Sequence, residues 1–154
     1  MKKTILLIML FSISNLFAQC ISGNCNNGYG VKKYADGTLY IGEWWNATPS
    51  GQGTLIWKDG TIYVGHFTKG AYNGDGTLLT SQNLYIGEFN KNMPNGHGTL
   101  FMDSGDMYVG DFQEGYMTGK GFLQHKNGTI EEAFWQNGEP IGEIIKQYSK
   151  YILR

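Results

Sequence analysis

The sequence is poor in the residues on which most catalytic and metal sites depend. Its 154 residues include two cysteines and three histidines. Lysine plus arginine number 12 against 13 for aspartate plus glutamate, so the chain lacks the basic excess that is typical of nucleic-acid binders. Glycine is abundant instead, with 23 residues, about twice its usual share. The composition therefore argues against a nucleic-acid partner and makes the placement of the glycines the main source of information.

The N-terminus has the pattern of an export signal. Lys2 and Lys3 precede an apolar run over residues 5–11, and the small residue Ala18 follows at a position suited to cleavage. The run is shorter than the roughly 20 apolar residues of a membrane span. We predict a signal peptide over residues 1–18 and a periplasmic, cell-surface or secreted destination. A buried N-terminal helix is the alternative.

The two cysteines, Cys20 and Cys25, follow directly after the predicted signal. In an oxidising compartment such a pair favours a disulfide. Two thiols without a nearby histidine make a poor zinc site, because structural zinc takes four ligands. The segment Phe17-Ala18-Gln19-Cys20 offers an alternative, since it resembles a bacterial lipobox in which Cys20 carries lipid, although Gln19 departs from that pattern.

One pattern, Tyr-x-Gly-x-aromatic, recurs along most of the chain. It reads Tyr40-Ile41-Gly42-Glu43-Trp44 and returns from Tyr63, Tyr85 and Tyr108, at spacings of 23, 22 and 23 residues. Self-similarity at such a period indicates stacked supersecondary units. Residues two apart share one face of a strand, so the tyrosine, the glycine and the second aromatic residue lie together. Because glycine in a strand marks a close approach, we predict that these glycines make room for aromatic rings.

Each unit continues with further glycines in a fixed order. A loop residue that tolerates a left-handed backbone comes first, as in Gly70, and Ala47 is the exception. A second strand then opens with Gly-x-Gly, as in Gly51-Gln52-Gly53. An Asp-Gly or Asn-Gly turn, such as Asp59-Gly60, closes the unit, and we predict positive φ at both of its central residues. The unit that begins at Tyr63 has lost one residue at this turn.

These features, in this order, resemble the MORN repeat family (membrane occupation and recognition nexus). The resemblance implies an all-β fold, a single-layer antiparallel meander of stacked β-hairpins. We predict a repeat array over residues 19–142, with a partial N-terminal unit, four full units and a degenerate fifth. In the fifth unit Glu131 replaces the tyrosine and Ala133 replaces the glycine. Atypical terminal units are expected of a capped array.

Beyond Pro140 the spacing of the apolar residues changes. The residues at helical spacing are Ile141, Ile144, Ile145, Tyr148, Tyr151 and Ile152. The polar side of this segment carries Lys146, Lys150 and Arg154. We predict an amphipathic helix over residues 143–154 that caps the last hairpin. A basic helix that docks on a membrane surface and a partner-binding helix are the alternatives.

No arrangement of residues predicts catalysis. The three histidines are His66, His97 and His125. Each occupies a position that is polar or variable in other units, which favours a solvated surface residue. A column of Glu43, His66, Glu88 and Asp111 has a unit spacing of about 10 Å, too wide for two carboxylates to share an ion or act as an acid–base pair. We therefore predict no enzyme activity, no cofactor and no metal site.

The predicted function is binding. We expect a non-catalytic exported scaffold that recognises another protein or an envelope component, because tyrosine and tryptophan carry much of the energy of protein interfaces. The candidate binding face consists of Tyr40, Trp44, Tyr63, Phe67, Tyr85, Phe89, Tyr108, Phe112 and Trp135. These rings must also supply the core of a single-layer sheet, and a purely structural role is one alternative. The second alternative is lipid or membrane-surface binding, which the family resemblance implies. The third alternative is an enzyme of unrecognised type.

Overall fold

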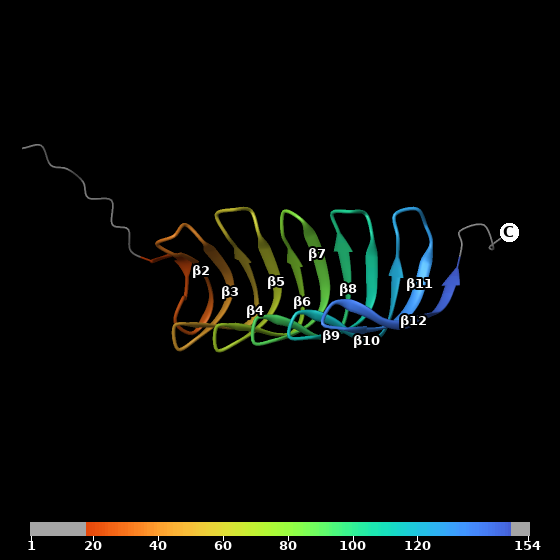
Figure 1. Ribbon diagram of the computed structural model, residues 1–154. Coiled ribbons are helices and arrows are strands. Elements are labelled where there is room, and N and C mark those ends of the chain that lie inside the picture. The colour runs from red at the N-terminus through yellow and green to blue at the C-terminus, as the bar shows by residue number, and fades with distance from the viewer. Residues whose placement is uncertain (1–17, 149–154) are drawn as a thin grey trace, which may run out of the picture.

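The computed structural model describes residues 18–148, and within them it contains strands and turns only. Twelve strands form one sheet in which every strand pairs antiparallel with its neighbours in sequence (Figure 1). The predicted all-β meander of stacked hairpins is confirmed. The predicted signal peptide, apart from Ala18, and the last six residues of the predicted helix lie outside the described residues.

The strands follow one another along the sheet in chain order. They are β1 (Gln19–Gly23), β2 (Gly28–Lys33), β3 (Leu39–Trp45), β4 (Thr48–Ile56), β5 (Ile62–Thr68), β6 (Ala71–Leu79), β7 (Asn83–Asn90), β8 (Met93–Met102), β9 (Met107–Gln113), β10 (Tyr116–Gln124), β11 (Ile130–Gln136) and β12 (Glu139–Tyr148). Each Tyr-x-Gly-x-aromatic segment is an odd-numbered strand, and each Gly-x-Gly segment lies on the even-numbered strand that follows.

A row of glycines crosses the sheet from strand to strand. The paired residues are Gly30, Gly42, Gly53, Gly65, Gly76, Gly87, Gly98, Gly110, Gly121 and, on β11, Ala133. A β-carbon at Gly110 would lie 2.6 Å from Cζ of the Tyr108 ring, closer than van der Waals contact allows, and one at Gly98 would lie 2.7 Å from Cε2 of the Tyr85 ring. The predicted role of these glycines, to make room for aromatic rings, is confirmed.

Each repeat tyrosine lies over two members of this row. Tyr40 lies against Gly42 and Gly53, and the same arrangement recurs for Tyr63, Tyr85 and Tyr108. The fifth unit lacks the tyrosine, and its row position is the buried Ala133. The replacement of the tyrosine by Glu131 permits the replacement of the glycine by Ala133, because without a tyrosine ring above it this position has space for a methyl group.

Two-residue loops connect the strands of each unit, and both of their residues have a left-handed backbone. Asn46 and Ala47 have φ of 48° and 57°, and Lys69 and Gly70 have φ of 51° and 82°. Two positive φ values in succession define the tight turn whose twist suits a β-hairpin. The left-handed loop position predicted from Gly70 is confirmed. Ala47 has the same left-handed backbone, which is sterically unfavourable for a residue with a β-carbon.

The Asp-Gly and Asn-Gly turns differ from the prediction, because only their glycine has positive φ. Gly37 has φ of 95°, whereas Asp36 is absent from the residues with positive φ. The amide of Gly37 donates to the Tyr34 carbonyl at 3.0 Å, and the amide of Tyr34 donates to Thr38 at 2.8 Å. This is a three-residue loop that ends in a left-handed glycine. The aspartate stabilises it by accepting a hydrogen bond from the Thr38 amide at 2.9 Å.

The ends of the two-residue hairpins stack along one edge of the array (Figure 1). The amide of Gly70 donates to the carbonyl of Pro49 in the preceding unit at 2.9 Å, and Gly115 bonds to Pro94 at the same distance. The sheet register shifts just before these ends, as between Gly42 and Trp44 on β3. The first glycine of each Gly-x-Gly lies at this shift and has positive φ, as its position in an irregular ladder requires.

The C-terminal segment is a strand, and the prediction of a helix is wrong for residues 143–148. β12 pairs with β11 through Glu131 opposite Gln147 and Phe134 opposite Ile141. Gly142 has φ of 74°, like the first glycine of each Gly-x-Gly. The segment therefore completes a sixth hairpin. Its β-branched isoleucines suit a strand, and pairing satisfies backbone groups of β11 that a helix would leave as an open edge.

Replacement of Ala47 by glycine should stabilise the protein by about 0.5–1 kcal/mol, because glycine removes the steric cost of the left-handed backbone. Chemical denaturation of Ala47→Gly would measure the change. Ala71→Gly is the matched control: Ala71 lies in a strand with ordinary φ, so glycine there should destabilise by a similar amount. Equal effects of the two substitutions would contradict the assigned turn geometry.

Candidate functional site

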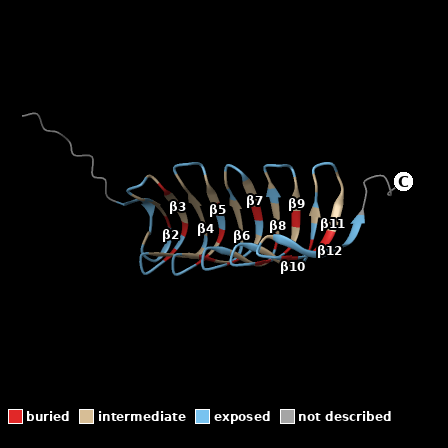
Figure 2. Cartoon of the chain, in the orientation of Figure 1, coloured by how far each residue is buried: buried red, intermediate tan, exposed pale blue. Residues whose placement is uncertain are grey.

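The nine rings of the candidate binding face are buried, each with at most 5% of its surface exposed. Figure 2 shows the buried residues as red segments within the strands, while the loops at both edges are exposed. The rings form one ladder in which each tyrosine contacts the aromatic residue of its own strand and that of the next unit. Tyr63, for example, makes edge-to-face contacts with Phe67 and Phe89, at centroid distances of 5.2 and 5.1 Å. Little ring surface is left for a partner.

The ladder is continuous from β3 to β11. Its successive members are Trp44, Tyr40, Phe67, Tyr63, Phe89, Tyr85, Phe112, Tyr108 and Trp135. Edge-to-face geometry suits aromatic quadrupoles and adds to the burial of apolar area. Tyr72, from the end of the β5–β6 hairpin, stacks on Tyr63 at a centroid distance of 3.8 Å, so that the hairpin end covers this part of the ladder.

The tyrosine hydroxyls are held by the backbone. Tyr85 Oη donates to the carbonyl of Glu88 at 3.0 Å, and Tyr40 Oη donates to Glu43 at 2.9 Å. Burial raises the pKa of Tyr85 to about 12, with a smaller contribution from the Glu88 carboxylate. Burial likewise raises the pKa of Tyr63 and of Tyr108 to about 12. The hydroxyls therefore act as neutral structural donors.

The acidic column on the opposite face has a structural role. Glu43 Oε1 accepts a hydrogen bond from the Gln52 amide at 3.2 Å, and Glu88 Oε1 accepts one from the His97 amide at 3.0 Å. These two glutamates thus each satisfy a backbone amide next to the register shift of the following strand, whereas Asp111 Oδ1 lies 3.1 Å from His97 Nδ1. Among the described residues no three His, Cys, Asp or Glu side chains gather in a group that could hold a metal ion.

An exposed aromatic patch lies at the N-terminal end of this outer face. Trp45 is 66% exposed and Tyr29 is 63% exposed. A shallow hollow beside them is lined by Glu43, Trp45, Ser50, His66 and neighbouring backbone. We call Tyr29, Glu43, Trp45, Ser50 and His66 the outer patch. It combines two aromatic surfaces with a carboxylate, a hydroxyl and an imidazole.

The sequence prediction missed the outer patch because Trp45 falls one residue beyond the repeated motif. The signal that could have found it is strand alternation: Trp44 shares the core face with Tyr40, so Trp45 must point the other way. Figure 1 places β2 and β3, which carry the two aromatic residues, at the N-terminal end of the array.

Two rows of mostly apolar side chains cover the rest of the outer face. The first row pairs Ile41, Thr54, Val64, Thr77, Ile86, Thr99, Val109 and Phe122. The second row pairs Leu39, Ile56, Ile62, Leu79, Leu84, Phe101 and Met107. We call these fifteen residues the apolar band. None of them is charged.

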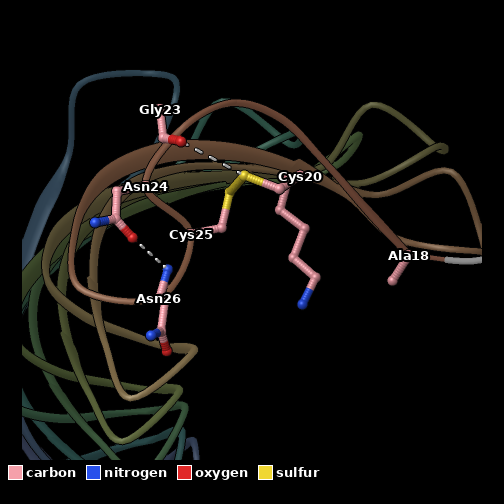
Figure 3. A pocket seen from close by; sticks show the side chains of 7 residues that line it. Ala18, Cys20, Gly23, Asn24, Cys25 and Asn26 are labelled. Carbon is pink, nitrogen blue, oxygen red and sulfur yellow. Dashed lines mark hydrogen bonds between the residues drawn. A yellow bond between two sulfur atoms is a disulfide. The ribbon is translucent and has the colours of Figure 1, made fainter.

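The predicted cysteine pair closes the first end of the array (Figure 3). Cys20 and Cys25 lie at disulfide distance, with Cα atoms 5.9 Å apart, which favours a disulfide over a lipid on Cys20. A β-carbon at Gly30 would lie 3.0 Å from Cys25 Sγ. The sulfur therefore covers the first glycine of the row, as a tyrosine ring does further along.

Comparison with protein families identifies four segments of the chain as MORN repeats: residues 27–39, 40–62, 85–107 and 108–130. Together they cover more than half of the sequence, and the chain belongs to the MORN repeat family. The unmatched segment 63–84 is the unit shortened by one residue, and β5 and β6 nevertheless form the same hairpin there. No curated protein matches the chain. MORN repeats are generally linked to protein or membrane binding.

Within residues 18–148 no helix has the length and apolar character needed to cross a membrane.

The buried tyrosines predict a loss of stability at alkaline pH. Their pKa is about 12 in the folded chain against 10.0 for an unperturbed tyrosine, so the unfolded chain releases their protons first. Their contribution is complete below pH 10 and is lost as the pH rises towards 12. Tyrosinate absorbance and circular dichroism should therefore change together in this range. Ionisation of the buried tyrosines near pH 10 with an intact fold would contradict this account.

Loss of the cysteine pair should destabilise only the first end of the array. Amide exchange in Cys20→Ser/Cys25→Ser should accelerate in β1 and β2, by an amount corresponding to about 2 kcal/mol, because the closed loop is short. Exchange in β7–β10 should stay unchanged, since each repeat contacts only its neighbours. Faster exchange throughout the sheet would show that the pair holds the whole array.

Proposed function

We propose that this protein is a non-catalytic, exported repeat scaffold that recognises another protein or an envelope component through the outer patch. The observation that carries the proposal is the exposure of Trp45. The corresponding residues in the other units are Thr68, Asn90, Gln113 and Gln136. The array thus tolerates small or polar residues at this position, and a large exposed aromatic ring there is not required for folding.

The composition of the outer patch suits protein recognition. Tryptophan and tyrosine are the residues most enriched at the energetic centres of interfaces. Trp45 and Tyr29 supply apolar area, and their loss from water on binding would be favourable. Glu43 and His66 next to them offer polar groups that can fix the orientation of a partner. The proposal assigns no reaction, cofactor or metal to the protein.

The aromatic ladder supports this function indirectly. Because its rings are packed against one another and against the glycine row, it gives the outer face a rigid support. A rigid support lowers the cost of ordering an interface on binding. The candidate binding face predicted from the sequence thus contributes stability, and the proposed contacts lie on the opposite side of the sheet.

Export is part of the proposal. The sequence pattern of residues 1–18 and the cysteine pair at disulfide distance both fit an oxidising compartment. Docking on a membrane through a basic C-terminal helix is not proposed, because residues 143–148 belong to β12. The described lysines are spread over many units, and the chain has a net charge of −1, which does not favour anionic headgroups.

Crosslinked capture from the native envelope fraction tests the proposal. The tagged protein should enrich one dominant partner, and an excess of untagged protein should compete it away. Trp45→Thr should reduce the enrichment at least tenfold, because truncation of a central interface tryptophan costs 2 kcal/mol or more. Threonine occupies the corresponding position on β5, so the fold should be unaffected.

Tyr116→Thr is the matched control, because Tyr116 is an exposed aromatic residue at the end of a hairpin far from the outer patch, and Thr48 occupies the corresponding position on β4. Its capture should equal that of the unmodified chain. Equal capture by Trp45→Thr and the unmodified chain would remove the outer patch from the interface. Absence of any competed partner would contradict the proposed function itself.

A further inference from the structure

The apolar band is half-buried or exposed along its whole length, although the core of the protein is complete without it. Ile86 is 45% exposed, and Val64, Leu79, Phe101 and Phe122 are exposed to a similar degree. They lie on the face of the sheet opposite the aromatic ladder, so no part of residues 18–148 packs over them. A contiguous apolar surface of this kind indicates an interface.

The band lies on the regular part of the sheet. The register shifts of the units fall beyond the glycine row, between Gly42 and Trp44 on β3 and between Gly87 and Phe89 on β7. The pairs within the band, such as Val64 with Thr77 and Ile86 with Thr99, follow an unbroken ladder. The band is therefore a regular surface against which a second sheet can pack, with one shallow hollow beside Val64, Thr77 and Ile86.

The first row of the band alternates along its length. From β3 to β8, valine or isoleucine on each odd-numbered strand is followed by threonine on the next, as in Val64, Thr77, Ile86 and Thr99. On β9 and β10, Val109 is followed by Phe122. The pattern repeats every two strands, or about 9–10 Å. A partner must have the same period to keep its side chains in phase with this row along the whole band. Another copy of this chain has that period by construction.

We propose that the apolar band is the interface between two copies of this chain, which pack sheet against sheet. The eight strands β3–β10 span about 35 Å, and two rows of side chains cover about 13 Å. Two such faces present roughly 900 Å² of projected area together, close to the lower limit of about 1,000 Å² for a specific interface. Burial of the band leaves no charge unpaired, because none of its members is ionisable.

Charged groups at the borders fix the relative orientation of the two copies. Glu43, Glu88 and Asp111 lie along one long border, beyond the glycine row. A two-fold axis along the length of the array places this acidic border of one copy opposite the turns of the other, so that the three carboxylates do not face their own counterparts. Those turns carry Lys58 and Lys126 as well as aspartates. At the β10 end the band stops at the buried Glu132, which is paired with Lys120.

Sedimentation velocity of the purified protein over a range of micromolar concentrations tests the proposal. The unmodified chain should form a discrete dimer. Ile86→Glu places one carboxylate per copy in the apolar interface, and the dissociation constant should rise on the order of 100-fold. Circular dichroism should be unchanged. Ile86→Thr, which keeps the β-branched shape, should weaken the dimer less and guards against an effect of misfolding.

Ile144→Glu is the matched control, because Ile144 is 47% exposed but lies on the terminal strand β12. It should leave the dimer intact. A monomer at every concentration would overturn the proposal, and so would a dimer that Ile144→Glu dissociates while Ile86→Glu does not, because the contact would then be an edge-to-edge pairing of β12. Assemblies without a defined size would also contradict it. The capture experiment with Trp45→Thr measures partner binding and the sedimentation experiment measures dimer formation, so the two proposals can fail independently.

Discussion

The contact between each repeat tyrosine and two glycines of neighbouring strands sets the conditions for the rest of the structure. A single-layer sheet has no second layer to bury its apolar side chains. Here the tyrosine ring lies close against the backbone, which is possible only because the glycine row leaves that strip of the sheet without β-carbons. The ring then contacts aromatic residues on both sides, and the contacts continue as one ladder from Trp44 to Trp135. The core is thus built from rings and backbone along the length of the array.

The same contact explains how the array ends. At the first end Cys25 takes the place of a ring above Gly30, and the cysteine pair ties β1 to the turn before β2. At the other end Glu131 replaces the tyrosine, Ala133 replaces the glycine, and Lys120 pairs with the buried Glu132. Both ends therefore stop the ladder of rings with groups that need no further unit beside them, as terminal repeats must.

Much of this fold can be predicted from the sequence, because the repeat fixes glycine and aromatic positions and strand alternation fixes their faces. The alternation of Tyr63, Gly65 and Phe67 is enough to place the core. The turns are harder, since Asp-Gly suits both a two-residue and a three-residue loop, and the closing hydrogen bonds decide between them. The apolar spacing of residues 143–148 is helical, and the segment is a strand because its backbone pairs with β11. The exposed position of Trp45 is easily missed in the sequence, because the residue directly before it, Trp44, belongs to the core.

The separation of the two faces has a consequence for function. The aromatic ladder occupies one face and is committed to stability, whereas the outer face holds Trp45, Tyr29 and the apolar band, which the fold does not need. This division rests on the claim that the rings and the glycine row are energetically coupled. A double-mutant cycle of Tyr85→Ala and Gly98→Ala measures that coupling directly. The account predicts that Gly98→Ala costs about 1–3 kcal/mol of unfolding free energy in the unmodified chain and close to nothing once the ring is removed. The same cost in both backgrounds would contradict it.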